Sequence, residues 1–417
     1  MKTLTSLWAA DFLMQIGAIK RCLIIAPVST LLTTWGMEIF TNLFHRKYRI
    51  LYGSKQQRLK HLNTDCDFYV INPDGLKVIE KELRARKDID HFIVDEGALW
   101  RNSQTDRYEA LENLCGPKTH SGLWWMTGSP MPKAPTDVWA QARLVNPATV
   151  PMYFSRFRNM VMYKASEYKW KPRQNWERYC YSVLQPSIRF ERDRINIPEC
   201  ITLPREVEMS TEQKAAYNQM AALFKAELRE GSITAVNEGV KLGKLNQIAC
   251  GAVYGKDGDA IQLDVRPKFT DLLRVLEECG GKAIVFMPYR HILDHISEKI
   301  RKSGYSVATV HGGVSKGRRD DIFHQFSHGS LQILTAQPQC MSHGLNLAAA
   351  HTIVWWGPPS SFETYEQANG RIRRPGQKFR QTIVRLYCSE IEKRIYQRID
   401  KQQSTQGILL ELLTHHE

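Results

Sequence analysis

The chain has 417 residues, of which 43% are hydrophobic and 24% are charged, so it is long enough for two or three domains that each bury a core. Its 57 Lys and Arg against 43 Asp and Glu give a net charge of +14, which favours nucleic acid as a partner over an acidic protein or a membrane surface. The nine cysteines are scattered and none has C-x-x-C spacing, which argues against a zinc cluster and against a secreted disulfide framework. The sequence has no apolar run of membrane-spanning length and no signal-peptide pattern, so we expect a cytoplasmic protein.

In the first third of the chain, helical and strand signals alternate. Apolar residues at helical spacing predict a helix up to Gly17, and the run Cys-Leu-Ile-Ile at 22–25 predicts a buried strand. Further strands are predicted at 68–72, at 91–94 and before Thr127. This order is typical of an open α/β sheet, in which ligands bind at the carboxyl ends of the strands.

Two adjacent carboxylates, Asp95 and Glu96, follow the predicted strand His91–Val94 directly. At the carboxyl end of a strand the two can act together. Asp95 can hold Mg²⁺, directly or through water, and Glu96 can orient and deprotonate an attacking water. An acidic pair after an apolar run also occurs by chance, so its meaning depends on the other motifs.

Residues 151–200 differ from the rest of the chain because basic residues alternate with aromatic ones. Cations can contact phosphates and rings can stack on bases, so we expect a nucleic-acid-binding surface without base specificity that includes Lys169, Lys171 and Arg173. Many of these rings are expected in a core instead, and a solvated basic surface is the alternative.

Helices are predicted at 209–229, where Ser-Thr-Glu-Gln gives a capping signal, and at 237–247. Beyond residue 266, strand and helix patterns alternate with short connections, which predicts a parallel sheet flanked by helices. A helix from Ile391 is expected to pack back onto this sheet through Tyr396 and Ile399.

Near the end of this part, the segment Tyr365–Gln377 reads Y-E-Q-A-N-G-R-I-R-R-P-G-Q. If it is helical, Arg371 and Arg374 lie on one face. Two guanidiniums on one face can bind phosphate oxygens and stabilise charge on a transferring γ-phosphoryl group.

Five segments together resemble the motifs of helicase superfamily two, specifically those of the Swi/Snf-type DNA-dependent ATPases. They are the segment above, H-G-G at 311–313, G-L-N-L at 344–347, I-V-D-E-G at 93–97 and T-G-S-P at 127–130. The resemblance extends over nearly the whole chain. It implies two RecA-like parallel-sheet lobes with an ATP site between them and a mostly helical, basic insertion.

The resemblance assigns nucleotide chemistry to residues of both lobes. Lys2 and Thr3 stand where a Walker A motif ends, so Lys2 would contact phosphates while Thr3 and Asp95 hold Mg²⁺. Gly344 and Asn346 would contact the nucleotide. The catalytic set would be Asp95, Glu96, Gln367, Arg371 and Arg374.

Contacts to the DNA backbone are implied at two further places. Ser29 and Thr30 would bind a phosphate at the start of a helix, although a plain helix cap is an equal alternative there. His311 and Gly312 would approach a phosphate of the DNA strand along which the enzyme moves. Arg318, on the next helix, would contact DNA beside them, and the alternative is that it belongs to a solvated helix face.

From these assignments we expect a first lobe at 1–150, the insertion at 151–262 and a second lobe at 263–417. The expected function is ATP- and Mg²⁺-dependent translocation of a monomer on duplex DNA, independent of sequence, in a bacterial or viral enzyme of replication, repair or recombination.

Three departures from the family pattern keep alternatives open. Ala98 stands where His is usual, the segment before Gly344 lacks a Gly-Gly pair, and no glycine loop precedes Lys2. The chain is therefore expected to begin inside its phosphate-binding loop and to bind ATP weakly until upstream residues are restored. The missing glycine loop suggests an inactive DNA-binding relic as one alternative. The other is an RNA helicase, against which Gly97 after the Asp95-Glu96 pair and the Gly376-Gln377 pair after Arg374 argue.

Overall fold

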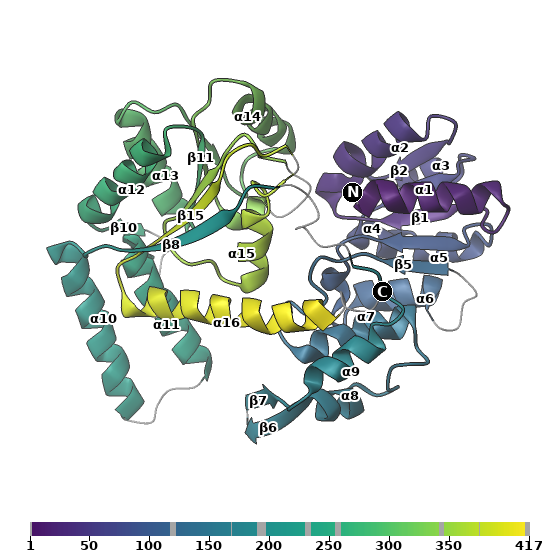
Figure 1. The fold of residues 1–417 in the computed structure, drawn as a ribbon, viewed down its shortest axis with the longest axis horizontal. Coiled ribbons are helices and arrows are strands. Elements are labelled where there is room, and N and C mark those ends of the chain that lie inside the picture. The colour runs from purple at the N-terminus through teal and green to yellow at the C-terminus, as the bar shows by residue number, and fades with distance from the viewer. Residues whose placement is uncertain are drawn as a thin grey trace. The chain divides into compact units, whose positions relative to one another are not determined.

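The computed structural model of the chain describes residues 2–116, 122–167, 169–189, 197–229, 235–254, 260–341, 346–374 and 376–412. Its contacts divide the chain into unit 1, Met1–Phe190 with Ser404–Glu417, and unit 2, Glu191–Gln403 (Figure 1). This division falls inside the predicted insertion 151–262, and the predicted domain boundaries stay a prediction.

Unit 1 is built on a five-stranded sheet in the order β2-β3-β1-β4-β5, and all its pairings are parallel. The strands are β1 Cys22–Ile25, β2 Tyr48–Leu51, β3 Phe68–Ile71, β4 His91–Val94 and β5 Gly122–Trp125. The helices before, between and after them are α1 Lys2–Gln15, α2 Met37–Asn42, α3 Lys55–Leu62, α4 Pro73–Val78, α5 Glu80–Ala85, α6 Asp106–Cys115 and α7 Val138–Val145. Short helical turns are η1 Val28–Thr30, η2 Leu31–Gly36, η3 Gly97–Trp100 and η4 Pro135–Asp137.

Helices cover both faces of this sheet, which explains why its central strands are apolar throughout. Leu23 and Ile25 of β1 lie in one core cluster, whereas Cys22 and Ile24 lie in another on the opposite face. Both clusters continue into β3 and β4 with the same alternation. A strand with two buried faces needs apolar side chains at every position, which is the signal read from the sequence.

His91 is a buried polar exception in β4. Its side chain is 3% exposed, its Nε2 has no hydrogen-bond partner among the described residues, and its ring meets Trp124 edge-on with the centroids 4.3 Å apart. Burial lowers the pKa of His91 to about 4. The folded protein therefore holds His91 neutral at pH values where the unfolded chain binds a proton.

We expect unit 1 to lose stability as the pH falls from 6.5 towards 4, because the unfolded state takes up the proton first. The loss due to His91 is about 3 kcal/mol across that range, and the contribution is fully present above pH 6.5. Urea unfolding at pH 7 and pH 4.5 should show a smaller pH effect for His91→Phe than for the wild type. Equal pH effects in the two proteins would contradict this assignment.

The segment after α7 has a small core of its own. Along the chain, helix α8 Phe154–Val161 precedes and helix α9 Trp176–Val183 follows an antiparallel hairpin of β6 Met162–Ser166 and β7 Lys169–Pro172, and Figure 1 shows both helices on the same side of this hairpin. Phe157, Val161 and Trp176 pack together with Val138 of α7. Part of the aromatic content of residues 151–200 is thus structural, as expected from the sequence.

Unit 2 is built on a six-stranded parallel sheet in the order β12-β13-β11-β14-β15-β8. Its strands are β8 Cys200–Glu206, β11 Ala283–Phe286, β12 Val307–Val310, β13 Ile333–Ala336, β14 Thr352–Trp355 and β15 Gln381–Tyr387, and β9 Ala252–Tyr254 pairs with β10 Ala260–Gln262 in a separate ribbon. Its helices are α10 Thr211–Arg229, α11 Ala235–Cys250, α12 Arg266–Cys279, α13 Arg290–Lys302, α14 Lys316–His328 and α15 Phe362–Asn369, with the short turn η6 Pro338–Met341. Helix α16 Glu390–Leu412 begins in unit 2, and its residues from Ser404 onward belong to unit 1.

The elements predicted for this part agree closely with the structure. Ser210 caps α10 by accepting a hydrogen bond from the Gln213 backbone N–H at 3.1 Å, as the capping signal indicated. Tyr396 and Ile399 of α16 lie in a core cluster on one face of the sheet. The predicted α/β class with two parallel sheets is confirmed. Among the described residues, no helix has the length and apolar character needed to cross a membrane.

Candidate functional site

The carboxylates Asp95 and Glu96 lie where β4 ends in unit 1, as predicted. Asp95 is 9% exposed, and both of its oxygens accept hydrogen bonds. Oδ1 accepts from the Glu96 backbone N–H at 3.0 Å, and Oδ2 accepts from the Trp35 indole N–H at 3.2 Å. Trp35 was not foreseen, because its helix lies 60 residues earlier and nothing in its local sequence marks it.

Burial raises the pKa of Asp95, the nearby charge of Lys2 opposes that shift, and the Glu96 carboxylate adds to it. The structure thus places Lys2, at the start of α1, within electrostatic range of Asp95. A buried carboxylate of this kind is stabilised in its charged form by a cation. The hard carboxylate oxygens of Asp95 fit Mg²⁺, which binds one or two protein oxygens and completes its shell with phosphates and water. Thr3, the other predicted ligand, lies in the first turn of α1.

Glu96 has a left-handed backbone, with φ 52° and ψ 52°. Such a conformation is costly for a residue with a Cβ and persists where the surroundings impose it. Gly97 supplies part of that constraint, because its N–H donates to the Met126 carbonyl at 2.9 Å. A Cβ added at Gly97 would lie 1.8 Å from Nε1 of Trp125, so only glycine fits against this indole.

The predicted phosphate-binding hydroxyls Ser29 and Thr30 have different environments in unit 1. Ser29 is exposed, whereas Thr30 is 5% exposed and its hydroxyl donates to the Pro27 carbonyl at 2.9 Å. The helix that follows is irregular, with the short turns η1 and η2 before α2. Of the two hydroxyls, only that of Ser29 faces solvent.

In unit 2, the prediction that Arg371 and Arg374 lie on one helix is wrong. Helix α15 ends at Asn369, and both arginines follow it in turns. Gly370 weakens the helix there, and Arg374 precedes a proline, which disfavours helical backbone. Arg371 is 5% exposed and Arg374 is half-buried, while Gln367 lies within α15.

The turn that carries the arginines is held by Gln377. Its side-chain amide N–H groups donate to the carbonyls of Ala348 at 3.2 Å, Ala350 at 2.8 Å and Ile372 at 3.2 Å. Its Oε1 accepts from the backbone N–H groups of the two following residues. The Gln377 side chain therefore holds the turn that follows α15 against residues 348–350, a role that its position in the sequence did not reveal.

The segment with Asn346 is tied to the same turn. The Leu347 N–H donates to the Arg371 carbonyl at 3.0 Å. Asn346 itself is exposed, and its side chain accepts from the Ala348 N–H at 3.2 Å. Gly344 lies outside the described residues, so its predicted contact to a nucleotide stays a prediction.

His311 and Gly312 follow β12 in a turn. The Gly312 N–H donates to Gln337 Oε1 at 3.3 Å, and Arg319 reaches back to the carbonyls of Val314 at 2.9 Å and Gly312 at 3.2 Å. Arg319 therefore shapes this turn. Arg318, its neighbour in α14, is exposed and is the side chain that faces solvent.

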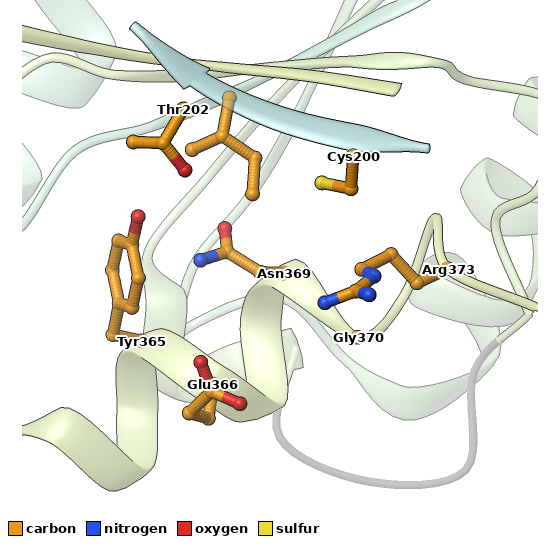
Figure 2. Close-up of a pocket in the computed structure, with 8 residues that line it drawn as sticks. Cys200, Thr202, Tyr365, Glu366, Asn369, Gly370 and Arg373 are labelled. Carbon is orange, nitrogen blue, oxygen red and sulfur yellow. The ribbon is translucent and has the colours of Figure 1, made fainter. Parts of the chain in front are cut away.

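A pocket of about 100 Å³ lies between β8 and α15 in unit 2. Figure 2 shows Cys200 and Thr202 of β8 facing α15 across it, with Arg373 at one end. Its lining residues are Cys200, Thr202, Tyr365, Glu366, Asn369, Gly370, Arg373 and Ile383. Arg373 lines this pocket, and its neighbour Arg374 does not.

The basic hairpin in unit 1 presents cations outward. Lys171 and Arg173 are exposed, and Arg158 of α8 stacks on Trp170 with 4.1 Å to the ring centroid. Arg173 also has a structural role, because its Nε donates to the Asn159 carbonyl at 2.8 Å and to the Met162 carbonyl at 3.1 Å. The side chain of Lys169 lies outside the described residues.

Lys268, which no sequence motif singled out, is fully buried in unit 2. Its Nζ lies 2.9 Å from Glu392 Oε1, and the two side chains are 1% and 0% exposed. Burial by itself lowers the pKa of Lys268, but neighbouring groups, Glu392 among them, more than offset this and the pKa is raised. The pair joins the first turn of α12 to the first turn of α16.

Comparison with known proteins gives two family matches. The model of the SNF2-related domain matches residues 1–250, and that of the helicase conserved C-terminal domain matches residues 267–376. Protein p41 of Acyrthosiphon pisum secondary endosymbiont phage 1 is 25% identical over 401 residues, covering 89% of this chain and 82% of that protein. The uncharacterized ATP-dependent helicase YqhH of Bacillus subtilis is 23% identical over 95% of this chain and 73% of its own length.

A longer relative is the ISWI chromatin-remodeling complex ATPase ISW1 of Saccharomyces cerevisiae, which is 24% identical over 95% of this chain, although the match covers 37% of that protein. Among solved structures, the Sulfolobus solfataricus SWI2/SNF2 ATPase core in complex with dsDNA aligns with a TM-score of 0.42 and 20% identity, covering 97% of this chain and 85% of that one.

Proposed function

Because the chain belongs to the SNF2-related family of ATP-hydrolysing, helicase-type enzymes, we propose that it couples ATP hydrolysis to movement along duplex DNA. The observation that carries the proposal is the group at the end of β4. There the buried Asp95 accepts hydrogen bonds from the Glu96 backbone N–H and the Trp35 indole N–H, and the positive charge of Lys2 opposes the rise of the Asp95 pKa that burial causes.

In this proposal the residues of unit 1 hold the triphosphate and activate water. Asp95 and Thr3 would hold the Mg²⁺ that accompanies ATP, and this ion would supply neutralisation of phosphate charge. Lys2 contacts the phosphates. Glu96, whose backbone conformation is set by the packing of Gly97, orients the attacking water and accepts its proton.

Glu96→Gln tests this assignment, because it removes the base while keeping the size of the side chain. We expect nucleotide binding to stay within a few-fold of the wild type and turnover to fall by about 10² or more. Glu109→Gln, the same change at an exposed position of α6, is the matched control. A wild-type level of hydrolysis in Glu96→Gln would exclude Glu96 as the base.

Duplex DNA is the proposed partner on grounds of charge and surface chemistry. The net charge is +14, and exposed cations and rings share the hairpin β6–β7, among them Lys164, Tyr163 and Lys171. Phosphate contacts of this kind give affinity without sequence preference.

Replacing Lys164 and Lys171 together by alanine should flatten the salt dependence of DNA binding by up to about two units of log–log slope. Sequence preference should not change. The double change Lys81→Ala with Lys87→Ala, at two exposed positions of unit 1 that do not belong to the hairpin, should leave the slope unaltered. If both double variants showed the same salt dependence of DNA binding, the hairpin would be an ordinary solvated surface and not a DNA-binding one.

An RNA substrate is the second candidate, because the ATP-dependent RNA helicase DBP3 of Meyerozyma guilliermondii is 28% identical over 45% of this chain. ATP turnover should be compared with no nucleic acid, with duplex DNA and with structured RNA. Stimulation by duplex DNA alone supports the proposal, and stimulation by RNA alone reverses it. No turnover under any condition would identify a binding protein without ATPase activity.

A further inference from the structure

We propose that Gln141 is a positioning residue for Glu96 and acts through Trp125. Gln141 and Trp125 together couple the conformation of the Thr127–Pro130 loop to the orientation of Glu96, the candidate base. The inference rests on the proposed ATPase function and adds two residues to it. Neither Gln141 nor Trp125 belongs to the residues assigned a role from the sequence.

The first link joins Glu96 to Trp125. Glu96 is held in the left-handed region at φ 52°, and Gly97 packs so closely on the Trp125 indole that no Cβ fits between them. Main-chain hydrogen bonds from Gly97 to Met126 and from Met126 to Val94 fix the same strand end. A shift of the indole therefore changes the backbone on which the Glu96 side chain is mounted.

The second link joins Trp125 to Gln141 of α7. The indole N–H donates to Gln141 Oε1 at 3.0 Å. Gln141 is 1% exposed, and its amide N–H groups donate to the Pro130 carbonyl at 2.8 Å and to the Asp137 carbonyl at 2.9 Å. The side chain thus accepts one hydrogen bond and donates two, so a buried polar group is satisfied in a single orientation.

The third link is the loop itself. Pro130 ends the segment T-G-S-P, in which the Ser129 N–H donates to the Thr127 hydroxyl oxygen at 3.1 Å. Asp137 anchors the next segment by accepting from the Lys133 N–H at 2.6 Å and the Ala134 N–H at 3.1 Å. Gln141 thus contacts one end of this loop directly and the Glu96 turn indirectly, through the Trp125 indole that packs on Gly97, so movement of the loop shifts the indole against which the Glu96 turn packs.

The test compares three variants with a matched control. Gln141→Leu removes all three hydrogen bonds with little change in volume, Trp125→Phe keeps a ring against Gly97 but removes the N–H donor, and the third variant combines both. The control is Gln213→Leu in unit 2, since Gln213 is also 1% exposed and also bridges two carbonyls, those of Ile248 and Ala249.

For Gln141→Leu we expect kcat for ATP to fall about tenfold while KM stays within twofold, because the change misplaces a catalytic group without removing a binding contact. The double variant should be no slower than the slower single variant, since both break one chain of contacts. Gln213→Leu should keep the wild-type kcat. Equal kcat losses in Gln141→Leu and Gln213→Leu, or additive losses in the double variant, would overturn the proposal.

Hydrogen exchange provides a readout that does not depend on activity. In Gln141→Leu, the amides of residues 95–100 and 126–130 should exchange at least about tenfold faster, whereas those of β1 and β3 should not change. In Gln213→Leu all of these amides should exchange as in the wild type. Unchanged exchange at Gly97 in Gln141→Leu would refute the link, whereas a wild-type chain without ATP turnover would refute the proposed function alone.

Discussion

Replacing Arg374 by alanine should lower ATP turnover by about 10³, the effect expected when a guanidinium that stabilises the transferring phosphoryl group is lost. Arg374 is half-buried in the turn after α15, and the Gln377 N–H closes that turn on its carbonyl at 3.2 Å. This hydrogen bond constrains the backbone at Arg374. Turnover and DNA affinity should be measured on the same preparations, and DNA affinity should change by a few-fold at most.

Arg373→Ala is the matched control, because it makes the same change in charge and size one residue earlier. Its side chain lines the pocket beside Cys200 (Figure 2), so we expect turnover within a few-fold of the wild type. If Arg374→Ala weakened turnover and DNA binding equally, the assignment of a catalytic role would be wrong. If Arg373→Ala lowered turnover as much as Arg374→Ala, the loss would follow from removing a positive charge from this turn and not from a specific role of Arg374.

Replacing Lys268 by methionine should destabilise unit 2 by about 3–5 kcal/mol, because the Glu392 carboxylate would remain buried without its cation. Glu392 Oε2 accepts hydrogen bonds from the Cys388 N–H at 2.7 Å and the Ser389 hydroxyl at 3.1 Å. These contacts hold the carboxylate in place but do not neutralise it. Urea unfolding of the wild type and the variant measures the difference.

Two further proteins separate the buried charge from the loss of a side chain. Lys268→Met combined with Glu392→Met should recover much of the lost stability, since apolar side chains of similar size can replace a buried ion pair at little cost. Lys302→Met, which removes an exposed lysine 3.8 Å from Glu298, should change stability by no more than about 0.5 kcal/mol. A Lys268→Met variant as stable as Lys302→Met would contradict the assignment.

The sequence predicted best those elements whose signal is local. The central strands of both sheets are buried on two faces and therefore appear as continuous apolar runs, such as 22–25 and 283–286. The carboxylate pair follows such a run directly, and its role was inferred from the resemblance of the surrounding motifs to those of the Swi/Snf-type ATPases. By contrast, β8 contains Pro204 and is exposed at several positions, so it lacks the pattern of a strand, and its place at the sheet edge depends on β15.

The residues that were missed act through partners distant in the chain. Lys268 meets Glu392 across 124 residues, and Trp35 meets Asp95 across 60. Gln141 was missed for another reason, because a buried glutamine on a helix looks like any polar residue until its three partners are known. The helix wrongly predicted over Arg371 and Arg374 shows that periodicity alone is insufficient where glycine and proline follow closely.

The pairing of β8 with β15 also bears on how the chain is made. β8 forms the edge of its sheet with a strand 181 residues later in the sequence, so its partner does not exist until the ribosome has synthesised nearly all of unit 2. Until then the backbone N–H and C=O groups of residues 200–206 have no native strand beside them and are open to pairing with another nascent chain. Completion of this sheet is consequently a late event in biosynthesis. It requires contact between the first and the last of the six strands to leave the ribosome.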